Sequence, residues 1–181
     1  MEELDKIIEG CKSGKRSSQE KLYRLLSGKL YGICLRYGKD EHQAKDFLQD
    51  VFIKIFDKIN SYMGKGSFEG WAKRLTVNHI LSILRKNTDS IFVEIDERHG
   101  DVDSDGDDDL DDIKIDILLK FIQNLPPKYR IVFNMYVIEE CSHQEIADEL
   151  GISVGTSKSN LHRAKSILKN DVEEYRKCNE Q

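Results

Sequence analysis

The side chains best suited to binding another molecule lie within SHQEIADELGISVGTSKSNLHRAK, residues 142–165. A short helix, a turn at Gly151 and a second helix are predicted there, which is a helix-turn-helix arrangement. Ala147 is small where the two helices would approach closely. The second helix exposes side-chain types that contact phosphates and base edges in the major groove of DNA: Thr156, Lys158, Ser159, His162 and Arg163. The pattern favours DNA binding over the alternative, an ordinary helical hairpin with a solvated polar face.

A second candidate segment mixes aromatic and basic side chains in SFEGWAKRLTVNHILSILRK, residues 67–86. Phe68 and Trp71 lie close to Lys73 and Arg74 in this segment. Aromatic rings beside cations can stack on unpaired bases and hold them. Because a tryptophan at helical spacing is more often part of a core, this segment alone is weak evidence for nucleic-acid binding.

A third candidate segment is DEHQAKDFLQDVFIKIFDKI, residues 40–59. Asp46, Gln49 and Asp50 would share the polar side of an amphipathic helix. Such a side is most often a solvated face, and the functional alternative is a docking surface for a partner helix.

The sharpest competing site is the acidic stretch DVDSDGDDDLDD, residues 101–112. Acidic residues occupy positions 1, 3, 5, 7, 9 and 12 of a twelve-residue calcium loop, and Gly106 occupies position 6. However, Asp112 is shorter than the usual bidentate glutamate, and Asp108 stands where an apolar residue should anchor the loop. We therefore predict no metal site and no cofactor.

Motifs of catalysis are missing from the sequence. GCKSGKRS, residues 10–17, is one residue short of a phosphate-binding loop and follows no strand. The sequence has no HExxH, no GxSxG and no clustered Cys/His set. We therefore predict that the protein is not an enzyme and has no catalytic residue.

The charge pattern divides the chain. The net charge is −5, but residues 1–87 carry +6, residues 88–116 carry −11 and residues 117–181 are neutral. The acidic middle is too charged to be buried. The sequence therefore predicts an all-α fold with two small helical domains, residues 1–87 and 113–181, joined by an acidic flexible linker at residues 88–112.

Helix ends are predicted from residue types that cap helices. Ser17 or Ser18 is expected to cap one long helix, and Asp40 to open the next. Ser142 with Glu145 three residues later forms a capping box at the start of the helix-turn-helix. The only strand-like run is residues 91–95, and it is short.

The N-terminus and the cysteines bear on the compartment. MEELDKIIEGCKSGKR has acidic residues where a signal peptide would be basic, and no apolar region. No uncharged run approaches the ~18 residues needed to span a bilayer. The four cysteines are far apart, and none forms a CxxC, so we expect reduced thiols. These features predict a cytoplasmic protein without membrane insertion.

Taken together, the three segments resemble the extracytoplasmic-function (ECF) group of bacterial sigma-70 factors. DFLQDVFIKIF is similar to a helix of the family's second region, and GSFEGWAKRLTVNHILSILRK to its promoter-melting and −10-reading segment. LPPKYRIVFNMYVIEECSHQEIADELGISVGTSKSNLHRAKSIL is similar to the fourth region, which reads the −35 element. The resemblance covers nearly all of the chain except the linker.

The resemblance implies partners and site residues. RNA polymerase core (its β′ and β subunits) and promoter DNA are the implied partners, and an anti-sigma factor is a further candidate. The residues implied in core binding are Asp46, Gln49, Asp50 and Phe52. Those implied at the −10 element are Ser67, Phe68, Trp71, Arg74 and Asn78. Those implied at the −35 element are Thr156, Lys158, Ser159, His162 and Arg163. No residue is implied in catalysis.

Some residues depart from the family pattern. Ser157 stands where relatives usually have an apolar residue, so looser packing of the recognition helix is expected. Lys158 and Asn160 often appear as arginine in relatives, and lysine offers a point charge instead of a bidentate fork.

The alternative function is a stand-alone helix-turn-helix regulator whose N-terminal half senses a ligand or a divalent ion. A dimer on a palindrome would favour that alternative, and a 1:1 complex with polymerase core would favour a sigma factor.

Overall fold

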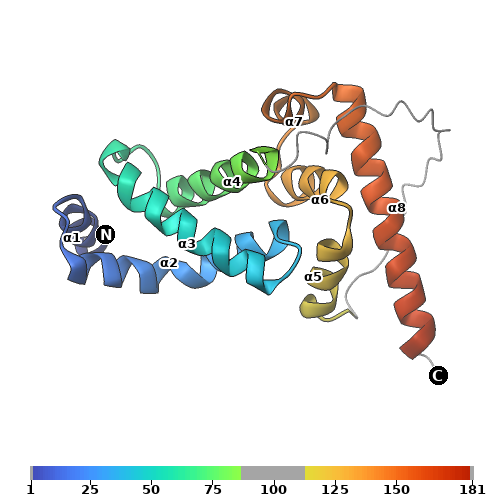
Figure 1. Cartoon of the computed structure of the whole chain (residues 1–181), viewed down its shortest axis with the longest axis horizontal. Coiled ribbons are helices and arrows are strands. Elements are labelled where there is room, and N and C mark those ends of the chain that lie inside the picture. The colour runs from blue at the N-terminus through green and yellow to red at the C-terminus, as the bar shows by residue number, and fades with distance from the viewer. Residues whose placement is uncertain (1, 87–112, 180–181) are drawn as a thin grey trace. The chain divides into compact units, whose positions relative to one another are not determined.

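The structure is a computed structural model that describes residues 2–86 and 113–179. The chain divides into two compact units, Met1–Asn87 and Thr88–Gln181. All regular elements of the described residues are helices (Figure 1), so the predicted all-α fold is confirmed. The predicted acidic linker and the strand-like run at residues 91–95 lie outside the described residues.

The N-terminal unit is built from four α-helices and one 3-10 turn. They are α1 (Glu2–Lys12), α2 (Arg16–Tyr37), α3 (Glu41–Lys58), η1 (Ile59–Ser61) and α4 (Phe68–Lys86). Helices α2, α3 and α4 pack against one another, and α1 packs on α2. The largest fully buried side chains come from all three long helices, including Tyr37, Ile55 and Ile80.

The ends of the long helices explain how α3 is placed. Asp40 accepts a hydrogen bond from the backbone N–H of Gln43 at 2.8 Å, as an N-cap should. Gly38 ends α2, where a Cβ atom would lie 3.0 Å from the carbonyl oxygen of Cys34. The turn between α2 and α3 is therefore tight, and α3 folds back along α2.

The expected cap of α2 at Ser17 or Ser18 is wrong. The helix already begins at Arg16, and its N-cap residue, Lys15, makes no side-chain capping bond. Ser18 instead packs against Gly10 of α1, where a Cβ atom would clash with the serine hydroxyl. The side chain of Ser18 therefore faces α1, in a position where it packs between the two helices.

The C-terminal unit contains four α-helices and one π-helical turn. They are α5 (Ile115–Asn124), α6 (Pro127–Phe133), η2 (Asn134–Ile138), α7 (His143–Leu150) and α8 (Val154–Asn179). Helix α8 packs against α5, α6 and α7. The buried Arg130 guanidinium donates hydrogen bonds to the carbonyl oxygens of Gln123 and Leu125, so it holds the end of α5 against α6. Burial lowers the pKa of this guanidinium.

Helices α7 and α8 form the predicted helix-turn-helix. The capping box at the start of α7 is present, with the backbone N–H of Ser142 donating to Glu145 at 2.8 Å. Gly151 ends α7 with a φ of 68°, a left-handed conformation that favours glycine. Ile146, Leu150 and Leu161 are buried between and beneath the two helices.

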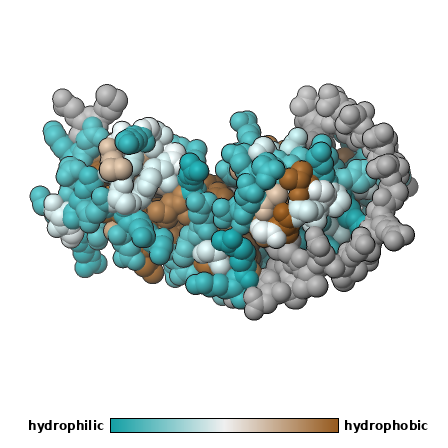
Figure 2. Space-filling model, turned by 90° about the horizontal axis from the view of Figure 1, so that it is seen from above, coloured by the Kyte–Doolittle hydropathy of each residue, from teal (hydrophilic) through white to brown (hydrophobic). Residues whose placement is uncertain are grey.

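One face of the described residues is mainly hydrophilic. Figure 2 shows hydrophilic residues over most of the visible face, with hydrophobic residues gathered in smaller patches. Among the described helices, none has both the length and the apolar character to cross a membrane.

Candidate nucleic-acid interface

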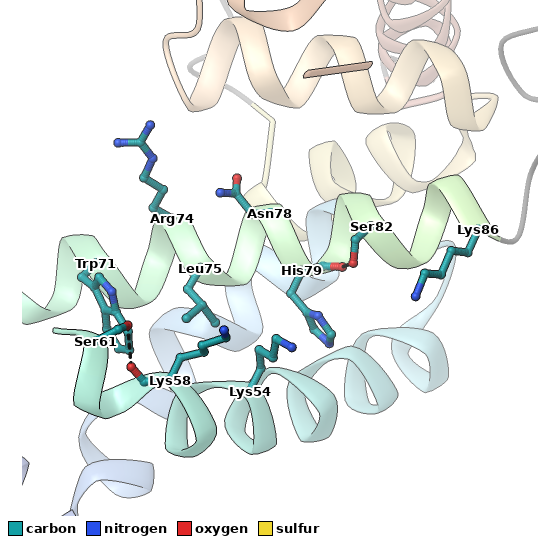
Figure 3. Close-up of a pocket in the computed structure, with 10 residues that line it drawn as sticks. All are labelled: Lys54, Lys58, Ser61, Trp71, Arg74, Leu75, Asn78, His79, Ser82 and Lys86. Carbon is teal, nitrogen blue, oxygen red and sulfur yellow. Dashed lines mark hydrogen bonds between the residues drawn. The ribbon is translucent and has the colours of Figure 1, made fainter. Parts of the chain in front are cut away.

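A basic groove lies between α3 and α4 in the N-terminal unit. Its volume is about 470 Å³. Figure 3 shows the residues that line it: Lys54, Lys58, Ser61, Trp71, Arg74, Leu75, Asn78, His79, Ser82 and Lys86. Four of these side chains carry a positive charge, and no carboxylate belongs to this lining. A groove of this composition suits an anionic chain such as a nucleic-acid strand.

The lining side chains fall into two groups (Figure 3). Arg74 and Asn78 are exposed, lie one turn apart on α4 and point away from α3. Lys54, Lys58 and His79 point toward one another in the space between the two helices. The groove therefore offers hydrogen-bonding side chains at one edge and cations along its floor.

His79 is half-buried in this groove. Burial is the main reason that its pKa is lowered, and Lys54 and Lys86 lower it further, while Asp50 opposes them. A lowered pKa keeps the imidazole neutral at pH 7. His79 therefore contributes a hydrogen-bonding ring and leaves the positive charge to the lysines and Arg74.

An aromatic cluster closes one end of the groove. The ring centroids of Tyr62, Phe68 and Trp71 lie 5.0 to 5.7 Å apart. The Tyr62 hydroxyl donates a hydrogen bond to the carbonyl oxygen of Gly66 at 2.8 Å, which closes the loop before α4. Phe68 is only 3% exposed, while Trp71 is half-buried and reaches the groove. The cluster fixes the loop and presents Trp71.

The structure brings three of the five expected −10 residues together. Trp71, Arg74 and Asn78 line the groove. Ser67 is exposed at the start of α4, where its hydroxyl accepts a hydrogen bond from the N–H of Gly70 at 3.0 Å. Phe68 is in the core. These two residues shape the loop and the first turn of α4.

Sequence reasoning missed Lys54 and Lys58 as groove residues. They lie four residues apart and hence on one side of α3, which was visible in the sequence. The sequence could not show that this side meets α4, because that depends on how the two helices pack.

The acidic side of α3 adjoins the groove but contributes none of its lining residues. Asp46, Gln49 and Asp50 are exposed, and Asp46 pairs with His42 at 3.1 Å. Ile53, one turn further on, is 61% exposed. The fourth residue expected in core binding, Phe52, is 4% exposed and its ring lies 4.5 Å from that of Tyr23. Phe52 therefore supports this surface from inside.

The expected −35 residues lie along the first half of α8. Lys158, Ser159 and His162 are exposed, and Thr156 and Arg163 are half-exposed. The hydroxyl of Ser153 accepts a hydrogen bond from the N–H of Thr156 at 2.9 Å, which caps the start of the helix. The five side chains thus belong to one well-capped helical segment.

The second helix of the helix-turn-helix is held by a polar contact. Ser157 is fully buried, and its hydroxyl lies 2.9 Å from Nδ1 of His143 on α7. The His143 ring stacks on Tyr136 with 4.5 Å between the centroids. Burial, and then the charge of Lys158, lowers the pKa of His143. A neutral imidazole thus bonds to Ser157, at the position where looser packing was expected.

Comparison with known proteins decides the family. The model of sigma-70 region 2 matches residues 22–89, and that of sigma-70 region 4 matches residues 115–168. Together these segments cover more than half of the chain. The chain belongs to the sigma-70 family. Region 2 includes the helices that form the groove, and region 4 includes the helix-turn-helix.

Its relatives place the chain in the ECF group. It is 29% identical over 157 residues to the ECF sigma factor SigE of Mycolicibacterium smegmatis, covering 84% of this chain and 60% of that protein. It is 26% identical over 180 residues to the ECF sigma factor SigW of Bacillus subtilis, covering 93% and 96% of the two chains. As an ECF sigma factor, it directs promoter-specific transcription initiation with RNA polymerase.

A solved structure shares the fold. The sigma factor RpoE from Bartonella quintana, solved in complex with the anti-sigma factor NepR, aligns with a TM-score of 0.52 and 20% identity. The alignment covers 85% of this chain and 96% of RpoE.

Sigma factors are not enzymes, which confirms the expectation drawn from the missing catalytic motifs.

Proposed function

We propose that this ECF sigma factor divides its task among three surfaces. The acidic side of α3 binds polymerase core, the groove between α3 and α4 holds the unpaired −10 strand, and α8 reads the −35 element as duplex. This division assigns −10 recognition to residues 1–87 and −35 recognition to residues 113–181. The groove carries the proposal, because it joins cations, an aromatic ring and an exposed amide in one place.

The chemistry of the groove suits a single strand. Flipping a base from the duplex costs a few kcal/mol, and stacking on an aromatic side chain returns about 1–3 kcal/mol per base. Trp71 supplies the ring, Asn78 can hydrogen-bond to a base edge, and Arg74 can contact the backbone. Lys54 and Lys58 add positive charge beneath the strand.

The acidic side of α3 suits a protein partner. Asp46, Gln49 and Asp50 surround a region where Ile53 is exposed, so charge complementarity and apolar burial are available in one patch.

Binding to polymerase would require the protein to be in the cytoplasm. RpoE of Bartonella quintana was solved with an anti-sigma factor, so such a protein is a candidate partner here as well.

Co-elution with polymerase core tests the core-binding surface. We expect the unmodified chain to elute with sigma-free core at one copy per core. Asp50→Lys should weaken binding roughly 10-fold or more, because a positive charge then faces a surface complementary to the acidic side. Size-exclusion chromatography at matched concentrations measures the bound share.

Asp5→Lys provides the control. Asp5 is exposed on α1 in the same unit, and the substitution makes the same charge change. This variant should co-elute like the unmodified chain. If Asp50→Lys also co-elutes fully, the acidic side of α3 does not bind core.

A further inference from the structure

A tyrosine on α6 contacts the arginine expected to read the −35 element. Nη1 of Arg163 on α8 donates a hydrogen bond to the hydroxyl of Tyr129 on α6, at 3.4 Å. The two residues are 34 positions apart in sequence, and the packing of α6 against α8 brings them together. Both side chains are half-buried. The contact therefore joins the recognition helix to the helix beside it.

A second cation approaches the same tyrosine. Nζ of Lys128 lies 5.1 Å from the centroid of the Tyr129 ring, within the range of a cation–π interaction. Tyr129 thus contacts Lys128 through its ring and Arg163 through its hydroxyl. Two positive charges from different helices thereby lie against one tyrosine.

The orientation of an arginine decides what it can read. A guanidinium recognises guanine through two parallel N–H bonds, which requires the plane of the group to be fixed. A flexible side chain loses conformational freedom when it binds, and restraint in the free protein lowers that cost. A hydrogen bond at Nη1 supplies such a restraint.

We propose that Tyr129 is a positioning residue that sets the base preference of Arg163. The inference rests on the proposed −35 role of α8 and extends it to α6, which holds none of the residues expected at the −35 element. It predicts a specific change in how the protein discriminates between base pairs. Loss of the Tyr129 hydroxyl reduces discrimination at the base pair that Arg163 reads and leaves preferences at other base pairs unchanged.

The variant Tyr129→Phe isolates the hydroxyl. It keeps the aromatic ring, its packing and its contact with Lys128, and removes only the hydrogen-bond acceptor. Tyr136→Phe is the matched control, because Tyr136 is exposed on η2 and the substitution removes the same hydroxyl while leaving the acceptor at Tyr129 in place. Thermal unfolding of each full-length variant checks that the fold is intact.

The experiment uses holoenzyme reconstituted from the full chain and sigma-free polymerase core. Promoter-length DNA duplexes with a randomised upstream segment are first mixed with holoenzyme, and the duplexes that bind are selected. The selected sequence and its single-base variants are then the probes for affinity. We expect Tyr129→Phe to reduce discrimination at one upstream position roughly 3- to 10-fold, the range for a single side-chain hydrogen bond. Tyr136→Phe should select and discriminate like the unmodified chain.

A double-mutant cycle separates positioning from other roles. If Tyr129 acts through Arg163, Tyr129→Phe has no further effect on discrimination in an Arg163→Ala background. An equal effect in both backgrounds would show that Tyr129 acts on its own and would overturn the inference, as would unchanged discrimination by Tyr129→Phe. If unmodified holoenzyme selects no upstream element at all, the proposed −35 role fails, and the inference fails with it.

Discussion

At the scale of single residues, the contact of buried Ser157 with half-buried His143 shows what the sequence could not predict. The sequence identifies Ser157 as a polar residue at a position that is usually apolar. It does not identify the partner, because His143 lies 14 residues earlier, on the other helix of the motif. The structure makes the serine a bonded member of the α7–α8 interface, and a buried polar group with a partner costs little.

Replacing Ser157 by alanine should destabilise the C-terminal unit by about 1–2 kcal/mol. The change leaves the half-buried ring nitrogen of His143 without its hydrogen-bond partner, and the cost of an unsatisfied buried group is in this range. Chemical denaturation followed by helical circular dichroism measures the difference in unfolding free energy.

Ser166→Ala is the comparison for this change. Ser166 is exposed on the same helix, so its replacement should alter stability by no more than about 0.5 kcal/mol. Equal effects of the two substitutions would mean that the contact with His143 contributes nothing to stability.

At the scale of elements, caps were more predictable than contacts between helices. Asp40 and the Ser142–Glu145 box were recognised because capping depends on residues within one turn. The start of α2 was missed because its N-cap residue, Lys15, makes no side-chain capping bond, and Ser18 packs against Gly10 of another helix. The groove forms only where α3 packs against α4, so only some of its residues could be named from the sequence.

The junction between η2 and α7 gives an element-scale prediction. Glu140 has a φ of 56°, in the left-handed region that favours glycine. Glu140→Gly should raise the unfolding free energy by about 0.5–1 kcal/mol, because relief of about 1–2 kcal/mol of strain exceeds the extra entropy of glycine in the unfolded chain. The midpoint of denaturant unfolding measures this change.

The neighbouring residue tests the explanation. Glu139 has a φ of −92°, which any residue adopts, so Glu139→Gly should destabilise the same unit. If both substitutions shift the midpoint in the same direction, the backbone conformation of Glu140 is not the cause.

At the scale of the whole molecule, the N-terminal unit carries an acidic surface as well as a basic one. The N-terminal 87 residues carry +6, yet the same unit presents an acidic side on α3 and a basic groove beside it. Net charge alone would not exclude either partner, since both surfaces belong to this one unit, and Asp50 of the acidic side is close enough to His79 of the groove to act on its pKa. Sequence patterns indicated the two units, and the packing of α3 against α4 shows how one unit can serve two partners.

Because the two surfaces proposed to contact DNA belong to different compact units, their contributions to promoter use should be nearly independent. Asn78→Ala removes an amide from the groove, and we expect it to slow promoter opening roughly 10-fold while upstream duplex binding is kept. Arg163→Ala removes a cation from α8, and we expect it to weaken upstream capture roughly 10-fold while core binding is kept. Sites without shared partners combine additively within about 0.5 kcal/mol, so the double variant should show the product of the two effects.

Run-off transcription on a promoter selected by the holoenzyme measures the overall effect, and permanganate reactivity of unpaired thymines reports opening separately. A double variant no worse than either single variant would show that the two surfaces act in one step, and the proposed division between the units would then be wrong.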